Sequence, residues 1–312
     1  MNFYGRDLIS INDFTSEELD TIITSADMCR RRPDLLSQSA AGRSLAMIFE
    51  KPSLRTRVTF EVAMTQMGGH AIYLQPSDIG LGKREPVKDV ARNLSRWCQA
   101  IMARTFTHQM VAELAEYATV PVINALSDLE HPCQALADFL TLYEHKGPLR
   151  SLKLAYVGDG NNVAQSLLLL AAKVGTHCSI GCPAGYQPRV DIVERARAIA
   201  ADTGARIEIT SDPADAVAGA DAVYTDVWTS MGQEEERAER LRVFPPYQLN
   251  AALLAQASPG ALVMHCLPAH RGEEITDEVI EGPQSVVLDQ AENRLHAQKT
   301  LLALAFGWNP DS

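Results

Sequence analysis

Two arginines and two hydroxyl side chains crowd the segment Ser53–Arg57, which reads SLRTR. Guanidinium groups donate paired hydrogen bonds to phosphate, and hydroxyl groups add single ones. The apolar run 44–49 before the segment predicts a buried strand, and the apolar spacing after it predicts one face of a helix. Ser53 is therefore expected at the helix N-cap, where backbone N–H groups and the helix dipole favour an anion. The pattern predicts a phosphate-type site, with a capped helix carrying solvated arginines as the alternative.

His131 and Gln134 stand at the predicted start of a later helix. An imidazole can donate a hydrogen bond to a carbonyl oxygen, and a glutamine amide oxygen can accept one from an NH₂ group. A carbamoyl group carries both features, so the pair suits a substrate with C=O and NH₂ on one carbon. His-Pro at a helix start is also a common turn, and this alternative stays open.

Two later loops carry groups that could meet an amine. Asp226 and Ser230 place a carboxylate and a hydroxyl on one loop, which could hold an ammonium group, although an Asx turn or a helix cap explains them equally well. Cys266 follows an apolar run with Arg271 close behind it, and a low-pKa thiolate there is a hypothesis. A Cys-His catalytic pair is not favoured, because His265 and Cys266 are adjacent on a strand and point to opposite faces.

The turn Gly158–Val163 resembles half of a dinucleotide-binding fingerprint. Its third glycine is missing, since Val163 stands there, and no acidic residue ends the next apolar run. A nicotinamide-dependent dehydrogenase is therefore an alternative that the sequence does not favour. The turn predicts a tight strand-to-helix connection that lets Asn162 meet a carboxylate or an amine.

Strand and helix signals alternate along the chain, which predicts an α/β protein with parallel sheets. Strand-like runs cover residues 44–49, 70–74, 100–103, 120–124, 153–157, 178–181, 206–210, 222–225, 262–265 and 286–288. A Leu- and Ala-rich helix is expected over 293–306, and Glu234–Glu236 with its alternating charges suggests a mobile loop or a solvated helix. Each polar group above follows an apolar run, and ligands of open α/β sheets bind beyond the carboxyl ends of strands. We therefore predict two doubly wound parallel-sheet domains with the active site in the cleft between them.

The composition limits the classes of protein that this chain could be. At 312 residues it is long enough for two domains, and its 46% hydrophobic content is that of a soluble globular protein. A net charge of -11 argues against a nucleic-acid or membrane partner. No apolar stretch reaches the length of a membrane span, and the N-terminus lacks signal- and transit-peptide character, so a cytoplasmic location is expected. The six cysteines form no zinc pattern, so no metal is expected and most should be buried thiols.

Taken together, these strings resemble the aspartate/ornithine carbamoyltransferase family over essentially the whole chain. The matching motifs are SLRTR from Ser53, HPCQ from His131, YVGDGNN from Tyr156, Asp226 with SMG from Ser230, HCLP from His265 and DQAENR from Asp289. The aspartate branch lacks the SMG and HCLP motifs, so the resemblance is closest to the ornithine branch. Two positions depart from the family pattern. Leu54 stands where the phosphate motif has Thr, and Gly80 stands where many members carry a Gln in a loop that can reach a neighbouring subunit's site.

The resemblance implies transfer of a carbamoyl group from carbamoyl phosphate to the δ-amine of L-ornithine, giving L-citrulline and phosphate in arginine metabolism. No cofactor is expected. A homotrimer or a multiple of trimers is expected, with residues 1–147 and the C-terminal helix 291–312 as the carbamoyl phosphate-binding domain and 148–290 as the ornithine-binding domain. The alternatives are a carbamoyltransferase for putrescine or an acylated ornithine, and a non-catalytic sensor of a phosphate ligand.

The resemblance also implies the site residues. Carbamoyl phosphate would be bound by Ser53, Leu54, Arg55, Thr56, Arg104, His131, Gln134, Cys266, Leu267 and Arg294. Ornithine would be bound by Asn162, Asp226, Ser230 and Met231. The implied catalytic residues are Arg104, His131, Asp226 and Cys266.

Overall fold

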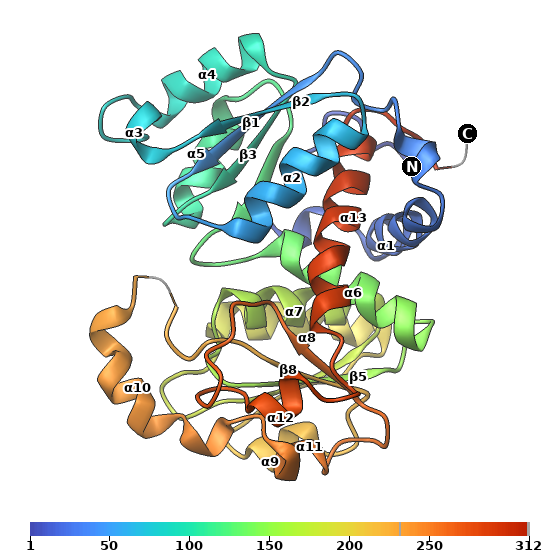
Figure 1. Ribbon diagram of the computed structural model, residues 1–312, viewed down its shortest axis with the longest axis vertical. Coiled ribbons are helices and arrows are strands. Elements are labelled where there is room, and N and C mark those ends of the chain that lie inside the picture. Colours follow the sequence, from blue (N-terminus) through green and yellow to red (C-terminus); the bar gives the residue numbers. More distant parts are fainter. Residues whose placement is uncertain (231, 311–312) are drawn as a thin grey trace. The chain divides into compact units, whose positions relative to one another are not determined.

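The computed structural model describes residues 1–230 and 232–310, which form two units (Figure 1). Unit 1 comprises Met1–Leu140 and Glu292–Ser312, and unit 2 comprises Thr141–Ala291. Two helices, α6 (Pro132–Lys146) and α13 (Val287–Ala305), contain residues of both units. None of the helices in the described ranges is long and apolar enough to cross a membrane.

Unit 1 is built on a four-stranded parallel sheet with the order β2-β1-β3-β4. Its strands are β1 (Ser44–Phe49), β2 (His70–Leu74), β3 (Ala100–Arg104) and β4 (Val122–Leu126). Its helices are α1 (Ser16–Arg31), α2 (Leu54–Gln66), α3 (Pro76–Ile79), α4 (Val87–Trp97) and α5 (His108–Tyr117), with the start of α6 and most of α13. The strand order reverses between β1 and β3, and the carboxyl ends of two such strands are where an open sheet binds its ligand.

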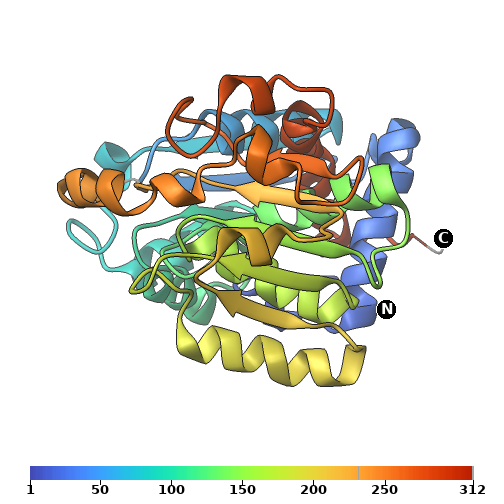
Figure 2. The same ribbon diagram turned by 90° about the horizontal axis from the view of Figure 1, so that it is seen from below.

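Unit 2 is built on a five-stranded parallel sheet with the order β7-β6-β5-β8-β9. Its strands are β5 (Lys153–Val157), β6 (His177–Gly181), β7 (Ile207–Thr210), β8 (Ala222–Thr225) and β9 (Leu262–His265). Its helices are α7 (Asn162–Val174), α8 (Val190–Thr203), α9 (Pro213–Val217), α10 (Arg237–Val243), α11 (Ala251–Leu254) and α12 (Asp277–Ile280). Figure 2 shows α8, in yellow, running along one face of these strands. Here the order reverses between β5 and β8.

The predicted α/β class with two parallel-sheet domains is confirmed. Most strands lie where an apolar run predicts them, because a strand buried on both faces is a continuous apolar run bounded by turn residues. The strand expected over 120–124 begins later, at Val122, since Pro121 lacks the N–H that a strand interior donates.

The strand predicted over 286–288 is wrong, because α13 already begins at Val287. An apolar run of three residues fits a strand and a helix equally well. The helix expected over 293–306 therefore starts six residues earlier, and the DQAENR motif lies within it rather than before it. This shift places Arg294 on the body of a helix.

Candidate active site

The N-terminus of α2 is capped as predicted. The Oγ of Ser53 accepts a hydrogen bond from the Thr56 backbone N–H at 3.3 Å. The buried apolar residues of α2 are Phe60, Ala63 and Met64. Thr56 is buried, Arg55 is half-buried, and Leu54 is 73% exposed. The hydroxyl that Leu54 replaces would therefore lie in solvent on this unit.

The two arginines of the SLRTR segment differ in their surroundings. The exposed Arg57 donates to Glu61 at 3.0 Å, and its guanidinium lies 3.8 Å from the ring centre of Tyr73. Arg55 instead lies close enough to His131 for its charge to lower the pKa of that imidazole. Of the two, Arg55 is the one whose charge acts on His131, another residue predicted to bind carbamoyl phosphate.

A buried hydrogen-bonded chain links three predicted residues of unit 1. Arg294 donates from Nη1 to Gln134 Oε1 at 2.6 Å and from Nη2 to Thr56 Oγ1 at 3.2 Å. Gln134 in turn donates from Nε2 to Asp138 Oδ1 at 2.7 Å. At most 2% of each of Arg294, Gln134 and Thr56 is exposed, so these bonds form in a desolvated environment where they are strong.

His131 and Arg104 complete this group. Arg104 ends β3, pairs in register with the last residue of β1 and is almost fully buried. Burial lowers the pKa of His131 well below its ordinary value, and the charges of Arg294, Arg104 and Arg55 lower it further. His131 is therefore neutral at physiological pH, beside three guanidinium groups that favour an anion.

In unit 2 the predicted residues gather around Asp226, which follows β8. Its Oδ2 accepts from the side-chain Nδ2 of Asn161 at 2.8 Å. Its Oδ1 accepts from the Cys266 thiol at 3.0 Å and from the backbone N–H of Val227 at 2.8 Å. Asn161 caps α7, directly after β5. Because β5 and β8 flank the reversal of the strand order, the carboxylate lies where an open sheet binds its ligand.

The remaining predicted residues of unit 2 lie near these elements. Asn162 is the first residue of α7 and is half-buried, and Ser230 is half-buried on the loop after β8. Leu267 follows Cys266 and has a φ of 58°, and its amide donates to His265 Nδ1 at 2.8 Å. Met231 lies outside the described residues.

Sequence reasoning missed the residues that support Asp226 and its loop. Asn161 holds the carboxylate, whereas the prediction assigned only its neighbour Asn162. Arg240 donates to Asp159 Oδ2 and to the Trp228 carbonyl, both at 2.8 Å, and it is 4% exposed. Glu234–Glu236, the segment expected to be a mobile loop or a solvated helix, is an exposed 3-10 helix just before Arg240. Burial raises the pKa of Asp159 to about 6 despite the adjacent guanidinium. A charged side chain gives no sequence signal that it will be buried.

The cysteines behave as expected, with one distinction. All six are thiols, and five are buried while Cys266 is half-buried. Burial raises the pKa of Cys133, Cys178 and Cys182 to about 12, so these thiols are unreactive. Arg271, suggested as a partner of Cys266, donates to Asp277 at 2.6 Å and to Glu281. Cys266 is thus the most accessible of the six thiols, and its observed neighbour is the carboxylate of Asp226.

Asp226, His265 and Cys266 also form a group with the chemistry of a metal site, since their ligand atoms lie within 4.8 Å of one another. Both ring nitrogens of His265 are engaged, Nδ1 by the Leu267 amide and Nε2 by Glu274 at 3.0 Å. The described arrangement therefore uses these side chains to position one another.

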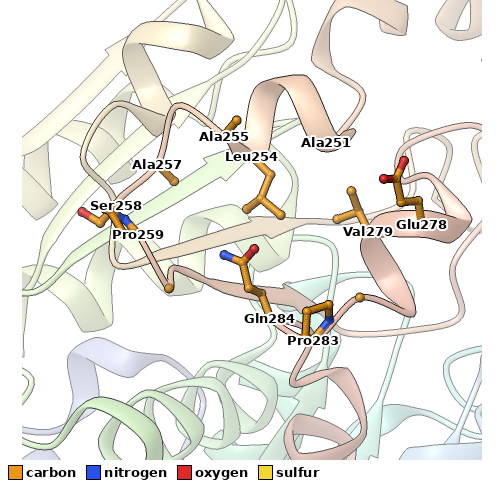
Figure 3. A pocket seen from close by; sticks show the side chains of 12 residues that line it. Ala251, Leu254, Ala255, Ala257, Ser258, Pro259, Glu278, Val279, Pro283 and Gln284 are labelled. Atoms are coloured by element: carbon orange, nitrogen blue, oxygen red, sulfur yellow. The ribbon is translucent and has the colours of Figure 1, made fainter.

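One cavity of unit 2 is lined by other residues. Figure 3 shows this pocket of about 350 Å³, whose lining comes from α11, α12 and the loops beside them. Its lining includes Leu254, Ser258, Glu278 and Gln284, and none of the predicted site residues. Size alone does not locate the chemistry of this chain.

Gly80 has a backbone that explains its departure from the family pattern. Its φ of 59° is left-handed, and a Cβ there would lie 2.7 Å from the Arg84 Cβ. A glutamine at this position would require the 80–85 loop to change conformation.

Comparison with known proteins gives a consistent family. The family description "Aspartate/ornithine carbamoyltransferase, carbamoyl-P binding domain" matches residues 6–144, and "Aspartate/ornithine carbamoyltransferase, Asp/Orn binding domain" matches residues 150–305. The chain is 53% identical to the ornithine carbamoyltransferase of Anoxybacillus flavithermus, with 96% of each chain covered. It is 53% identical to the anabolic ornithine carbamoyltransferase of Pyrococcus furiosus, with 97% of each covered. A solved structure of ornithine carbamoyltransferase from P. furiosus matches with a TM-score of 0.96 at 51% identity, covering 99% of each chain.

Proposed function

The chain belongs to the aspartate/ornithine carbamoyltransferase family, and we propose that it transfers the carbamoyl group of carbamoyl phosphate to the δ-amine of L-ornithine. The products are L-citrulline and phosphate. The observation that carries the proposal is that Arg294 donates to both Gln134 and Thr56 beside the neutral His131 and the N-terminus of α2. This group combines an anion site with a donor and an acceptor for a carbamoyl group.

The N-terminus of α2 would bind the phosphate. Ser53, Arg55 and Thr56 offer two hydroxyls and a guanidinium, and Arg104 adds a second guanidinium from the neighbouring strand end. Leu54 would contribute its backbone N–H. Positive groups fixed here also stabilise the phosphate as it leaves, since negative charge accumulates on it during the transfer.

The carbamoyl group would meet His131 and Gln134. A neutral imidazole can donate to the carbamoyl oxygen without carrying charge, and Thr56 and Arg104 would add further donors as the oxygen becomes negative. Removing one such preorganised donor typically costs about 2.7–4 kcal/mol of transition-state stabilisation. Arg294 orients the Gln134 amide so that its oxygen faces the guanidinium.

Unit 2 would bind ornithine. Asn162, Asp226, Ser230 and Met231 would hold its amino-acid end, and Cys266 with Leu267 would lie near the reacting amine. A δ-ammonium resembles that of lysine, with a pKa near ~10, so it must lose a proton before it can attack. A desolvated pocket lowers that pKa and favours the neutral amine.

The same proposal includes the finer expectations on assembly and pathway. Unit 1 would be the carbamoyl phosphate-binding domain, and unit 2 the ornithine-binding domain. A homotrimer, or a multiple of trimers, is part of the proposal because the family resemblance implies it. A biosynthetic role is supported by the name of the anabolic relative from P. furiosus, and the cytoplasm is the expected location.

Steady-state kinetics test the function directly. The purified chain should form citrulline from carbamoyl phosphate and L-ornithine, with a kcat/KM at least about 100-fold above that for putrescine or N-acetylornithine as acceptor. Preference for either of those amines would overturn the choice of acceptor. Light scattering of the same sample measures the oligomeric state.

A further inference from the structure

His265 and Glu274 form a fully buried pair in unit 2, with 0% of either side chain exposed. His265 is the last residue of β9, and its Nε2 lies 3.0 Å from Glu274 Oε1. The same Oε1 accepts from the His270 amide at 2.6 Å. The amide of His265 donates to Gln290 Oε1 at 2.9 Å, which fixes the backbone of this strand end.

The hydrogen bonds determine where the imidazole proton lies. His265 Nδ1 faces the amide N–H of Leu267 at 2.8 Å, and a nitrogen that accepts from an N–H carries no proton itself. The proton of the neutral ring is therefore on Nε2, which donates to Glu274. Glu274, an acceptor for two N–H groups, is then the carboxylate that selects this tautomer.

The Leu267 amide belongs to a turn that the hydrogen bond to His265 Nδ1 holds in place. Leu267 has a φ of 58°, a left-handed conformation that a leucine adopts only when its surroundings hold it there. The residue before it is Cys266, whose thiol donates to Asp226 Oδ1 at 3.0 Å. Loss of the acceptor at His265 Nδ1 would release the turn and, with it, the direction of the thiol.

We propose that Glu274 is a positioning residue, which holds His265 in the Nε2–H tautomer so that Nδ1 fastens the Leu267 amide and aims the Cys266 thiol at Asp226. Glu274 touches neither Cys266 nor Asp226 in this scheme, and it acts through His265 alone. The relevance to catalysis rests on the proposed function, in which Cys266 lies near the reacting amine. The geometric claim does not depend on it.

The first test is made on the unaltered protein. Nitrogen NMR of protein labelled in its histidine rings distinguishes a protonated Nε2 from a protonated Nδ1, and the His265→Asn variant assigns the signal that disappears. The proposal requires that the ring proton of His265 lies on Nε2. An Nδ1–H form, or rapid exchange between the two forms, would overturn it.

The second test follows the Cys266 thiol by its rate of alkylation with iodoacetamide, measured by mass spectrometry of the Cys266 peptide. Glu274→Met keeps the side-chain volume but removes the acceptor, so alkylation should accelerate at least about tenfold, the effect of losing one charge-assisted hydrogen bond. Glu274→Gln keeps an acceptor oxygen and should stay within about threefold of the unaltered rate. The buried Cys133 and Cys178 should remain unmodified in every variant, which excludes general unfolding.

Two further variants separate positioning from a merely structural effect. In the His265→Asn variant the asparagine side-chain oxygen can accept from the Leu267 amide in place of Nδ1. Adding Glu274→Met to this variant should therefore leave its alkylation rate unchanged. Gln248 donates to the carbonyls of Gly272 and Glu273 at 3.0 and 2.8 Å, so Gln248→Met loosens the same loop without touching His265 and should leave the rate unchanged.

The outcomes decide between the claims. Acceleration by Glu274→Met that persists in the His265→Asn background, or that Gln248→Met reproduces, would overturn the proposal. Unchanged alkylation in Glu274→Met would overturn it as well. If the unaltered protein forms no citrulline while the NMR and alkylation results hold, the proposed function fails and the positioning role of Glu274 stands.

Discussion

Arg294 donates to the amide oxygen of Gln134 at 2.6 Å, although 160 residues separate them in the chain. The second amino group of the same guanidinium reaches Thr56, which lies at the N-terminus of α2. One side chain of α13 therefore orients a proposed carbamoyl-binding amide and a proposed phosphate-binding hydroxyl together. Any change at Arg294 should affect both halves of carbamoyl phosphate.

Arg294→Lys tests this double contact. A lysine keeps the charge but offers a single point donor, so it cannot hold two acceptors in the fixed geometry of a guanidinium. We expect kcat/KM for carbamoyl phosphate to fall about 100-fold, with the unfolding free energy lowered by about 1–3 kcal/mol because a buried acceptor loses its donor. Steady-state kinetics and urea unfolding measure the two effects. A variant with unaltered kinetics would show that Arg294 has no role in binding.

Arg55→Ala and Arg57→Ala form a matched pair on one helix. Arg55 lies near His131 and the other proposed phosphate residues, whereas Arg57 is exposed and paired with Glu61. Citrulline formation should fall at least about 100-fold in Arg55→Ala, since a charged contact to the transferring group is lost. Arg57→Ala should stay within about threefold, as expected for a surface ion pair. Equal losses would refute the distinction between them.

Leu54→Thr restores the hydroxyl that the family motif carries. Leu54 is 73% exposed, so the substitution disturbs no packing and should change the unfolding free energy by less than about 0.5 kcal/mol. If this motif position works through its backbone N–H, the KM for carbamoyl phosphate should change less than about twofold. A KM lowered tenfold or more would mean that the side chain matters.

Asp226→Asn addresses the other substrate. Asp226 accepts from Asn161, Cys266 and Val227, so an amide NH₂ in its place would face a donor as well as lose the charge. The KM for ornithine should rise at least about tenfold, while the KM for carbamoyl phosphate changes less than about twofold. Circular dichroism checks that the variant is folded. Equal changes in both constants would contradict the assignment of Asp226 to ornithine.

Local patterns predicted the parts of the fold and site that depend on neighbouring residues. The Ser53 cap lies within one turn of the residues that reveal it, and the apolar runs locate most strands. The error at 286–288 arose because three apolar residues carry no period, so tertiary packing decided that α13 begins at Val287.

The pairings within the site could not be predicted in this way. Asn161 and Asp226 are 65 residues apart, and Arg240 and Asp159 are 81 apart. Their hydrogen bonds form only after β5 and β8 lie side by side. In addition, the sequence does not distinguish a buried arginine from a solvated one. Resemblance to a family supplied the residues proposed to contact substrate, but the residues that hold them in place came from the structure.

The last prediction concerns His131 and pH. Its pKa is well below the ordinary 6.5 in the folded chain, because burial and three guanidinium groups oppose its charge. Below pH 6.5 the unfolded chain takes up a proton at His131 and the folded chain does not. The stability that the neutral His131 contributes is therefore fully present above the pKa of the unfolded state. It is lost as the pH falls toward the pKa of the folded state. The loss should reach about 1.4 kcal/mol per pH unit. His131→Gln removes this titration. Urea unfolding at a series of pH values measures the difference in unfolding free energy between the unaltered protein and the variant. This difference should shrink as the pH falls below 6.5. A difference that stays constant from neutral pH to pH ~5 would show that His131 titrates normally in the folded state, and the neutral donor proposed for the carbamoyl oxygen would then be wrong.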